Sequence, residues 1–224
     1  LVINETIPCA DTILYRAYIS ALGSSGIEAP FLLRANHNGN IAQTPYSSNL
    51  SVGLIKSATC PTRWWDYDFG IELTGRLESE PIINGKRTSS TTLTGYFEQL
   101  YAHVRLYVLD LTAGIQPLVY GSQSSRLSMG GLLFSGNAHP IPRLTIGIDN
   151  YVAFPGAFGY LEIKGGLTYG WLDDNNAFVD DIQLHHKFIG VRAGGKFPVK
   201  LSYEIHYDAQ WGGYKKPLSA GDIK

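Results

Sequence analysis

Three side chains near the carboxyl end of the chain combine acid, base and metal-binding chemistry at a regular spacing. Glu204, His206 and Asp208 alternate with apolar residues, so in a β-strand they point to one face, about 7 Å apart at each step. At that spacing they suit an acid/base pair or a metal site only if a neighbouring strand supplies further groups. A row of solvated polar side chains is the commoner outcome. The sequence therefore predicts no catalytic residue and no metal site.

Common short motifs for catalysis or cofactor binding are missing from the sequence. It lacks the phosphate-binding loop G-x-x-x-x-G-K-[ST], the zinc protease motif H-E-x-x-H, C-x-x-C and the nucleophile elbow G-x-S-x-G. His185 and His186 are adjacent, so in a strand they point to opposite faces and cannot chelate one ion together. The aspartates within residues 173–181 lack the ligand spacing of a calcium loop and indicate a hydrated connection. We therefore expect no cofactor and no enzymatic activity.

Further polar rows alternate with apolar residues elsewhere in the chain, and one of them is expected to begin at Phe97. Each row mixes acidic, basic, amide and aromatic hydroxyl groups without one dominant sign of charge. Such a mixture suits hydroxyl-rich ligands such as sugars, and equally a water-filled interior. The candidate ligand-binding residues on all these rows are Asp66, Asp68, Glu72, Arg76, Gln99, Tyr101, His103, Arg105, Glu162, Lys164, Glu204, His206 and Asp208.

The elements that must position these residues are β-strands with two chemically different faces. From Trp65 to Leu77 the odd positions are apolar or glycine, and most even positions are acidic, basic or hydroxyl residues. The same period of two runs from Tyr160 to Trp171 and from Val199 to Trp211. Weaker runs predict strands over Asn49–Ile55, Gly95–Arg105, Asp110–Ile115, Arg143–Ile148 and Gln183–Ala193.

The run from Thr12 to Leu22 fits two kinds of secondary structure. Asp11, apolar residues at helical spacing and a final Gly23 suit a capped helix. A strand would instead place Ile13 and Ile19 on one side. The surrounding runs are strand-like, so we expect a strand here.

Composition excludes several classes of protein. A net charge of −1 gives no electrostatic footprint for nucleic acid. The 25 glycines and 14 tyrosines favour strands over helices. No stretch reaches the roughly 18 apolar residues of a membrane-spanning helix. Cys9 and Cys60 match neither a disulfide framework nor a zinc pattern, and they either pair in an oxidising compartment or remain separate thiols.

Strand length and aromatic placement bear on the choice between a soluble β-sandwich and a membrane β-barrel, which both hide one face of each strand. At ~3.3 Å per residue, a strand from Trp65 to Leu77 would be long for a globular protein and long enough to cross a tilted bilayer. Trp65 opens one apolar face, and Trp171 and Trp211 close two others, as expected of aromatic girdles. We therefore predict an all-β fold, an antiparallel transmembrane β-barrel of the outer membrane, with the sandwich as the alternative.

The barrel hypothesis also assigns the two faces of each strand. Asp66, Glu72 and Arg76 would point into the lumen and Ile71 at lipid. A register slip of one residue would point every polar side chain of the strand at the hydrocarbon core of the membrane. We therefore expect only one of the two face assignments to be compatible with folding.

Connection lengths predict the orientation and extent of this barrel. Gly194–Pro198 is a short turn of the periplasmic kind, whereas residues 78–90 and 172–181 are longer polar connections of the extracellular kind. We expect residues 1–224 to be one barrel domain, with residues 1–11 as a leader segment of undefined structure. Both ends of the sequence resemble cuts and only about ten candidate strands are present, so an incomplete part of a larger barrel is expected.

The segment Ser135–Pro142 is the most distinctive in the chain. Two prolines around Ile141 cannot sit in a central strand, so this segment is expected to interrupt the sheet. Other distinctive segments accompany it, and the full set is Ser128–Leu144, Ile148–Tyr151, Gly159–Gly165, Ala29–Asn36, Glu98–Ala102 and Ala209–Gly213. These segments, which extend over most of the chain, resemble the capsule assembly protein Wzi family, in the form found in Bacteroidetes.

The resemblance implies an outer-membrane barrel that acts as a lectin and retains capsular or exported polysaccharide at the surface of a Gram-negative cell. The expected partners are that polysaccharide and outer-membrane lipid, with no nucleic acid. No short sugar-binding motif carries over to this chain. A nonspecific porin or transporter is the first alternative function. An outer-membrane hydrolase is the second, and it depends on Glu204, His206 and Asp208 alone.

Overall fold

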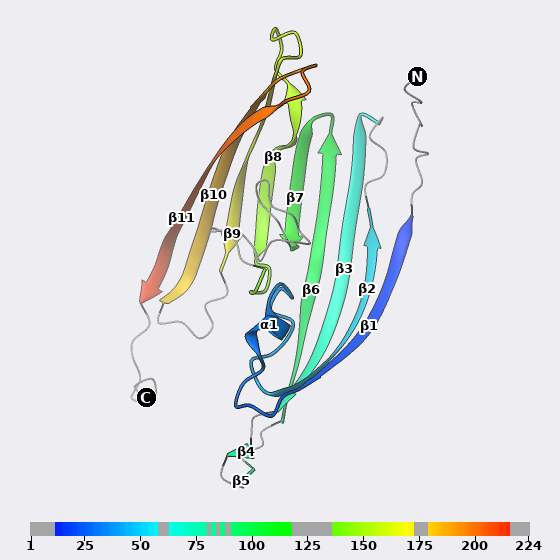
Figure 1. Cartoon of the computed structure of the whole chain (residues 1–224), viewed down its shortest axis with the longest axis vertical. Helices are drawn as coiled ribbons and strands as arrows, with labels where there is room; N and C mark the ends of the chain where they lie inside the picture. The colour runs from blue at the N-terminus through cyan, green and yellow to red at the C-terminus, as the bar shows by residue number, and fades with distance from the viewer. Residues whose placement is uncertain are drawn as a thin grey trace. The chain divides into compact units, whose positions relative to one another are not determined.

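A computed structural model describes residues 12–57, 63–79, 82–83, 86–87, 91–117, 136–172 and 179–215 and shows an all-β protein. Its elements are β1 (Ile13–Gly23), α1 (Phe31–Arg34), β2 (Tyr46–Lys56), β3 (Trp65–Ser79), β4 (Ile82–Ile83), β5 (Lys86–Arg87), β6 (Thr91–Leu106), β7 (Leu109–Ile115), β8 (Pro142–Ala153), β9 (Leu161–Trp171), β10 (Val179–Ala193) and β11 (Leu201–Lys215). Nine strands form one antiparallel sheet in the order β1-β2-β3-β6-β7-β8-β9-β10-β11, and β4 pairs with β5 (Figure 1). Among the described residues the sheet is not closed, because this order does not return to β1.

The strands expected from period-two alternation are confirmed. The ambiguous run from Thr12 to Leu22 is β1, which pairs with β2 along its whole length. The segment Ser135–Pro142 was expected to interrupt the sheet, and its described residues 136–141 lie outside the strands. Pro142 is the first residue of β8, a position where a missing backbone N–H is tolerated.

Two compact units make up the chain. The first contains β1, β2, most of β3 and β6, the connection formed by residues 24–45, and residues 136–140. The second contains the end of β6, most of β7, and all of β8, β9, β10 and β11. Each unit therefore has its own run of neighbouring strands on which polar side chains can be aligned.

Burial in this sheet is the reverse of that in a water-soluble protein, where apolar side chains fill the interior. On β3, Glu72 and Thr74 are fully buried, whereas Ile71 and Leu73 are each 46% exposed. The same holds on β9, where Thr168 is buried and Leu167 is half exposed. We call the side with the buried hydroxyl and charged groups the polar face and the opposite side the apolar face. The buried apolar side chains of the described part are Ala29, Ala42, Pro45 and Leu184.

Turns and connections differ in length between the two ends of the strands. Tyr107 and Val108 join β6 to β7, residues 154–160 join β8 to β9, and residues 194–200 join β10 to β11. The last of these contains a tight turn in which Phe197 N donates to Gly194 O at 2.8 Å. The connection from β1 to β2, residues 24–45, is much longer and contains the single turn of helix α1.

Aromatic side chains gather at both ends of the strands in the second unit. Trp171 of β9 and Trp211 of β11 are both paired with Gln183 of β10, so they lie at the same level. Both ring systems pack edge-on against Tyr169. At the opposite end, beside the short turn after β6, Trp64 packs against Trp65 and Tyr107. Trp171 and Trp211 therefore mark one end of the strands in the second unit.

In the part of the chain that the structure describes, no helix has the length and apolar character needed to cross a membrane.

Candidate functional site

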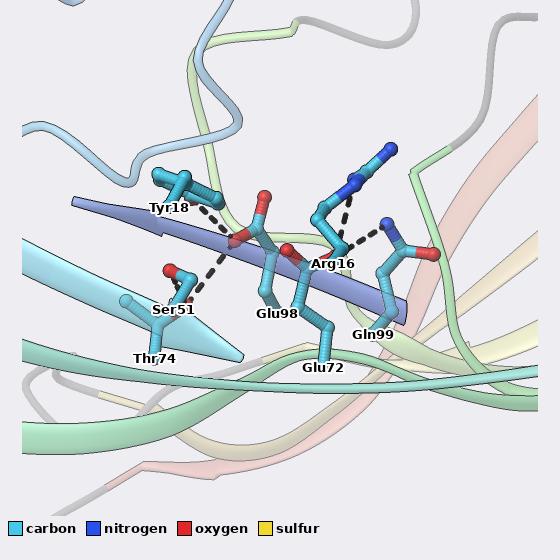
Figure 2. A network of polar contacts seen from close by, with 7 residues as sticks. All are labelled: Arg16, Tyr18, Ser51, Glu72, Thr74, Glu98 and Gln99. Atoms are coloured by element: carbon cyan, nitrogen blue, oxygen red, sulfur yellow. Dashed lines mark hydrogen bonds and ion pairs between the residues drawn. The ribbon is translucent and has the colours of Figure 1, made fainter. Parts of the chain in front are cut away.

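Glu72 is the first of two carboxylates that organise the polar face of the first unit. Its Oε2 accepts hydrogen bonds from Arg16 Nη1 at 3.3 Å and from Gln99 Nε2 at 3.2 Å (Figure 2). Glu72 is fully buried, whereas 44% of the Arg16 side chain is exposed. The ion pair therefore connects a buried charge with a solvated one.

Glu98 is the second carboxylate, and three strands supply the groups around it. Its Oε2 accepts from Tyr18 Oη at 2.9 Å and from Thr74 Oγ1 at 3.2 Å, and Ser51 Oγ lies 2.6 Å from Thr74 Oγ1 (Figure 2). Strand register explains this convergence, because Tyr18 is paired with Ser51 and Ser51 with Thr74. Residues paired directly across strands point to the same face.

The alternation of faces breaks within β6. Glu98 and Gln99 are adjacent, yet both side chains bond to groups of the polar face. Tyr96 lies on that face as well, since its hydroxyl donates to Asn40 Oδ1 at 3.1 Å. Phe97 is 46% exposed on the apolar face, so the prediction that the polar row begins at Phe97 is wrong. The one-residue shift between Glu98 and Gln99 is the reason.

Tyr96 and Glu98 are thus polar-face residues that the sequence analysis missed. A signal for them exists in the sequence, because Thr94, Tyr96 and Glu98 alternate with the apolar or glycine residues Leu93, Gly95 and Phe97. The second half of β6 places Tyr101 on the polar face, over Gly70 of β3. A Cβ atom added to Gly70 would lie 2.5 Å from Tyr101 Cε1, so the ring occupies the space that a side chain at position 70 would need.

The connection formed by residues 24–45 folds back over the polar face of the first unit. Asn49 Nδ2 donates to Asn40 O at 3.0 Å, and Arg76 Nη1 donates to Gly39 O at 3.1 Å. Within the connection, Ala29 N donates to Gln43 O at 2.9 Å and holds its two arms together. This part of the polar face is therefore covered by the chain itself.

Two segments far apart in the sequence meet at this connection. Asn38 N donates to Gly136 O at 2.7 Å, and Asn36 N donates to Asn137 Oδ1 at 2.8 Å across 101 residues. Asn36 and Asn38 both have a positive φ, a conformation that asparagine adopts more readily than most residues. The contact brings Ala29–Asn36 next to the described residues of Ser135–Pro142.

Glu204 organises the polar face of the second unit. Its Oε1 accepts from Lys164 Nζ at 2.8 Å and from Tyr151 Oη at 2.9 Å, and its Oε2 lies 3.3 Å from His206 Nε2. Gly190 of β10 is paired with Glu204 on one side and Lys164 on the other. Because Gly190 has no side chain, Lys164 can reach across β10 to the carboxylate.

Beside Glu204 lies a stack of aromatic rings. His206 and His186 are nearly parallel at 5.5 Å, and Phe188 is stacked on His206 at 5.6 Å. His186 is fully buried, and its Nε2 is 3.2 Å from His206 Nδ1. Asp208 is paired with His186 in the register, and its carboxylate oxygens receive no hydrogen bond from the described residues. The four side chains form a compact continuation of the Glu204 network.

Two further ion pairs and one His–Asp contact lie on the polar face of the second unit. His103 Nε2 is 2.9 Å from Asp110 Oδ1, and Arg105 Nη2 donates to Asp66 Oδ2 at 3.2 Å. Arg192 Nε donates to Glu162 Oε2. The polar face is thus dominated by paired charges of both signs.

The structure places every candidate residue from the sequence in a strand but divides them between the units. Those in the first unit are Asp68, Glu72, Arg76, Gln99 and Tyr101. Those in the second unit are Asp66, His103, Arg105, Glu162, Lys164, Glu204, His206 and Asp208.

Metal-binding residues were considered in the same regions. Among the described residues, no group of three or more His, Cys, Asp or Glu side chains is arranged to hold a metal ion. Cys9, Cys60, Asp173 and Asp174 lie outside the described residues.

Comparisons with known proteins give no family to which the chain can be assigned. It matches no family model, no curated protein and no solved structure. Its function is therefore inferred from its own residues and geometry.

Proposed function

We propose that this chain is part of an outer-membrane β-barrel that binds and retains polysaccharide at the surface of a Gram-negative cell. The reversed burial of the sheet is the observation that carries this proposal. Charged and hydroxyl groups such as Glu72 and Thr74 are fully buried, while neighbours such as Ile71 are exposed. Strands of a transmembrane barrel alternate in the same way, with apolar side chains toward lipid and polar ones toward the lumen.

A soluble sandwich accounts less well for these faces. It would bury the apolar face against a second sheet and leave the polar face in water. Among the described residues, however, the polar face is the enclosed one, and carboxylates on it such as Glu72 and Glu204 form ion pairs. The aromatic clusters around Trp65 and Trp171 support a membrane location as well, because aromatic girdles mark the two interfaces of outer-membrane barrels.

Polysaccharide binding is favoured over free diffusion by two features of the first unit. Residues 24–45 cover part of its polar face, where a nonspecific porin would leave an open water-filled passage. Amide and aromatic hydroxyl groups, among them Asn49, Tyr96 and Asn137, contact this cover, and such groups suit sugars. The resemblance of Ala29–Asn36 and Ser135–Pro142 to capsule assembly proteins adds further support.

A hydrolase has less support from the geometry. Glu204 is the carboxylate that would serve as its acid or base, but Lys164, Tyr151 and His206 already surround it. Such a carboxylate stabilises the protein rather than facing a substrate.

Deletion of the gene in the source bacterium tests the proposed function. We expect the polysaccharide layer to be lost from the cell surface and to appear in the growth medium, and a plasmid copy of the full-length gene should restore it. Imaging of the surface layer and assay of the released sugar provide the measurement. The permeability of the outer membrane to a small dye is the control. A surface layer that is unchanged in the deletion strain would contradict the proposal.

Conductance in planar bilayers tests the porin alternative on the same full-length protein. We expect no large steady conductance from the unaltered protein, because residues 24–45 cover part of the polar face. Replacing residues 25–44 with a short Gly-Ser linker should raise the conductance. A large steady conductance before this replacement would favour the porin.

A further inference from the structure

A cavity in the first unit is lined by groups that the networks around Glu72 and Glu98 do not use. Its volume is about 470 Å³, within the range of roughly 300–1,000 Å³ that is typical of small-molecule sites. The connection formed by residues 24–45, the end of β3 and residues 136–140 provide its walls. The side chains that matter for its chemistry are Phe31, Arg34, Arg76, Glu78, Asn137 and His139.

Two guanidinium groups in this cavity each have an N–H donor without an acceptor among the described residues. Arg34 Nε and Arg76 Nε are both buried, and neither donates a hydrogen bond to a described residue. Arg76 donates through Nη1 to Gly39 O and lies 3.8 Å from the nearest oxygen of Glu78, which neutralises it only loosely. A buried N–H of a charged group is costly to leave unpaired, so such groups call for an explanation.

An anionic ligand with two oxygens in one plane would satisfy both of these donors. The Nε and Nη N–H groups of an arginine form a planar fork that matches a carboxylate with two parallel hydrogen bonds. Two arginines against one glutamate leave a net positive charge among the acidic and guanidinium groups of the lining. The charge of the cavity therefore favours a carboxylate over a neutral ligand.

The remaining lining suits a sugar ring attached to such a carboxylate. Asn137, Gln43 and Thr44 offer amide and hydroxyl groups, and Phe31 is about half exposed and offers an aromatic surface. His139 packs edge-on against Tyr96 at 4.5 Å, which fixes its ring at the wall.

We infer that this cavity binds the carboxylate-bearing sugar of an acidic polysaccharide, with Arg34 and Arg76 holding the carboxylate. The inference rests on the proposed function and adds the chemical class of the polymer. It also gives residues 24–45 a second role, because they carry Arg34 as well as covering the polar face.

Titration of the full-length protein in detergent with uronic acids tests this inference. The probes are D-glucuronate and D-galacturonate, each compared with its methyl ester, which keeps the sugar ring but blocks the charge. Saturation-transfer NMR measures the binding. We expect the free acids to bind about tenfold more tightly than the esters, since a charge-assisted contact is lost on esterification.

Variants identify the cavity as the binding site. Arg34→Gln and Arg76→Gln should each weaken binding of the free acid by about tenfold and leave binding of the ester unchanged. Lys196→Gln removes one exposed positive charge from the short turn of the second unit and should have no effect, which controls for net charge. A normal heat-modifiable band for each variant shows that it has folded.

The outcomes separate the two proposals. Equal binding of acid and ester, no binding of either, or binding that survives both arginine substitutions would overturn the acidic-sugar site. In each of these cases, loss of the surface layer on gene deletion would still support polysaccharide retention. Arginine-dependent binding of the acids with an unchanged surface layer would support the site and overturn the retention function.

Discussion

Gly70 and Gly75 lie on the same strand, β3, but only one of them has a side chain packed over it. The Tyr101 ring lies over Gly70, so a Cβ there would come within 2.5 Å of Cε1, whereas a Cβ at Gly75 would meet nothing within 4 Å. Gly70→Ala should therefore lower the free energy of unfolding by about 1–3 kcal/mol through overpacking. Heat-modifiable gel migration of the full-length protein, followed against temperature, measures the effect.

Gly75→Ala is the matched control on the same strand. Open space around Gly75 and the lower chain entropy of alanine in the unfolded state predict a stability unchanged or raised by up to about 1 kcal/mol. Equal destabilisation by both substitutions would mean that the packing of Tyr101 over Gly70 does not matter.

At the scale of single residues, the sequence predicted which side chains share a face of a strand better than it predicted which side chains contact each other. Glu204 and His206 were placed on one row by alternation alone. The contact of Glu204 with Lys164 and Tyr151 depends on the register of three strands and on Gly190 between them. Register across strands is set by the whole sheet, so these partners have no signature at a fixed spacing in the sequence.

At the scale of single strands, the two faces of β3 make opposite predictions for charged substitutions. Ile71 is 46% exposed, and Arg at an exposed position in water would change stability by no more than about 0.5 kcal/mol. At mid-depth in a bilayer the introduced arginine would instead lower the stability of the folded protein by about 2–4 kcal/mol. We therefore expect Ile71→Arg, and likewise Ile163→Arg on β9, to block assembly of the full-length protein, as shown by loss of its heat-modifiable band.

Glu72→Gln and Glu162→Gln are the controls on the polar faces of the same two strands. Both keep an oxygen that can accept from Arg16 or Arg192, so the protein should still fold. Normal folding of the arginine variants together with failure of the glutamine variants would reverse the face assignment.

The strands themselves could be predicted because alternation is a local signal, and β1, β3, β9 and β11 all follow it. Departures from this alternation could not be predicted from the sequence. Such a departure occurs in β6 between Glu98 and Gln99. The register of β8 against β9 also shifts between Ile148 and Val152, which no local pattern predicts. The fold of residues 24–45 depends on Gly136 and Asn137, about a hundred positions away, and no local pattern encodes such contacts.

At the scale of the whole molecule, the two edges of the sheet matter most. β1 pairs with β2 and β11 pairs with β10, and each is the last strand of the described sheet on its side. An edge strand presents unpaired N–H and C=O groups. In water these groups bond to solvent, but in a bilayer each unpaired group costs several kcal/mol.

A membrane location therefore requires both edges to be paired in the native protein, by further strands of the same protein or by a second copy. Hydrogen exchange of the full-length protein in detergent measures this directly. We expect the backbone amides of β1 and β11 to be protected as strongly as those of β3, which has a partner on each side. Fast exchange along β1 and β11 beside slow exchange in β3 would show open edges in contact with water. That outcome is incompatible with a closed barrel and would favour a soluble sheet, whatever its polar face binds.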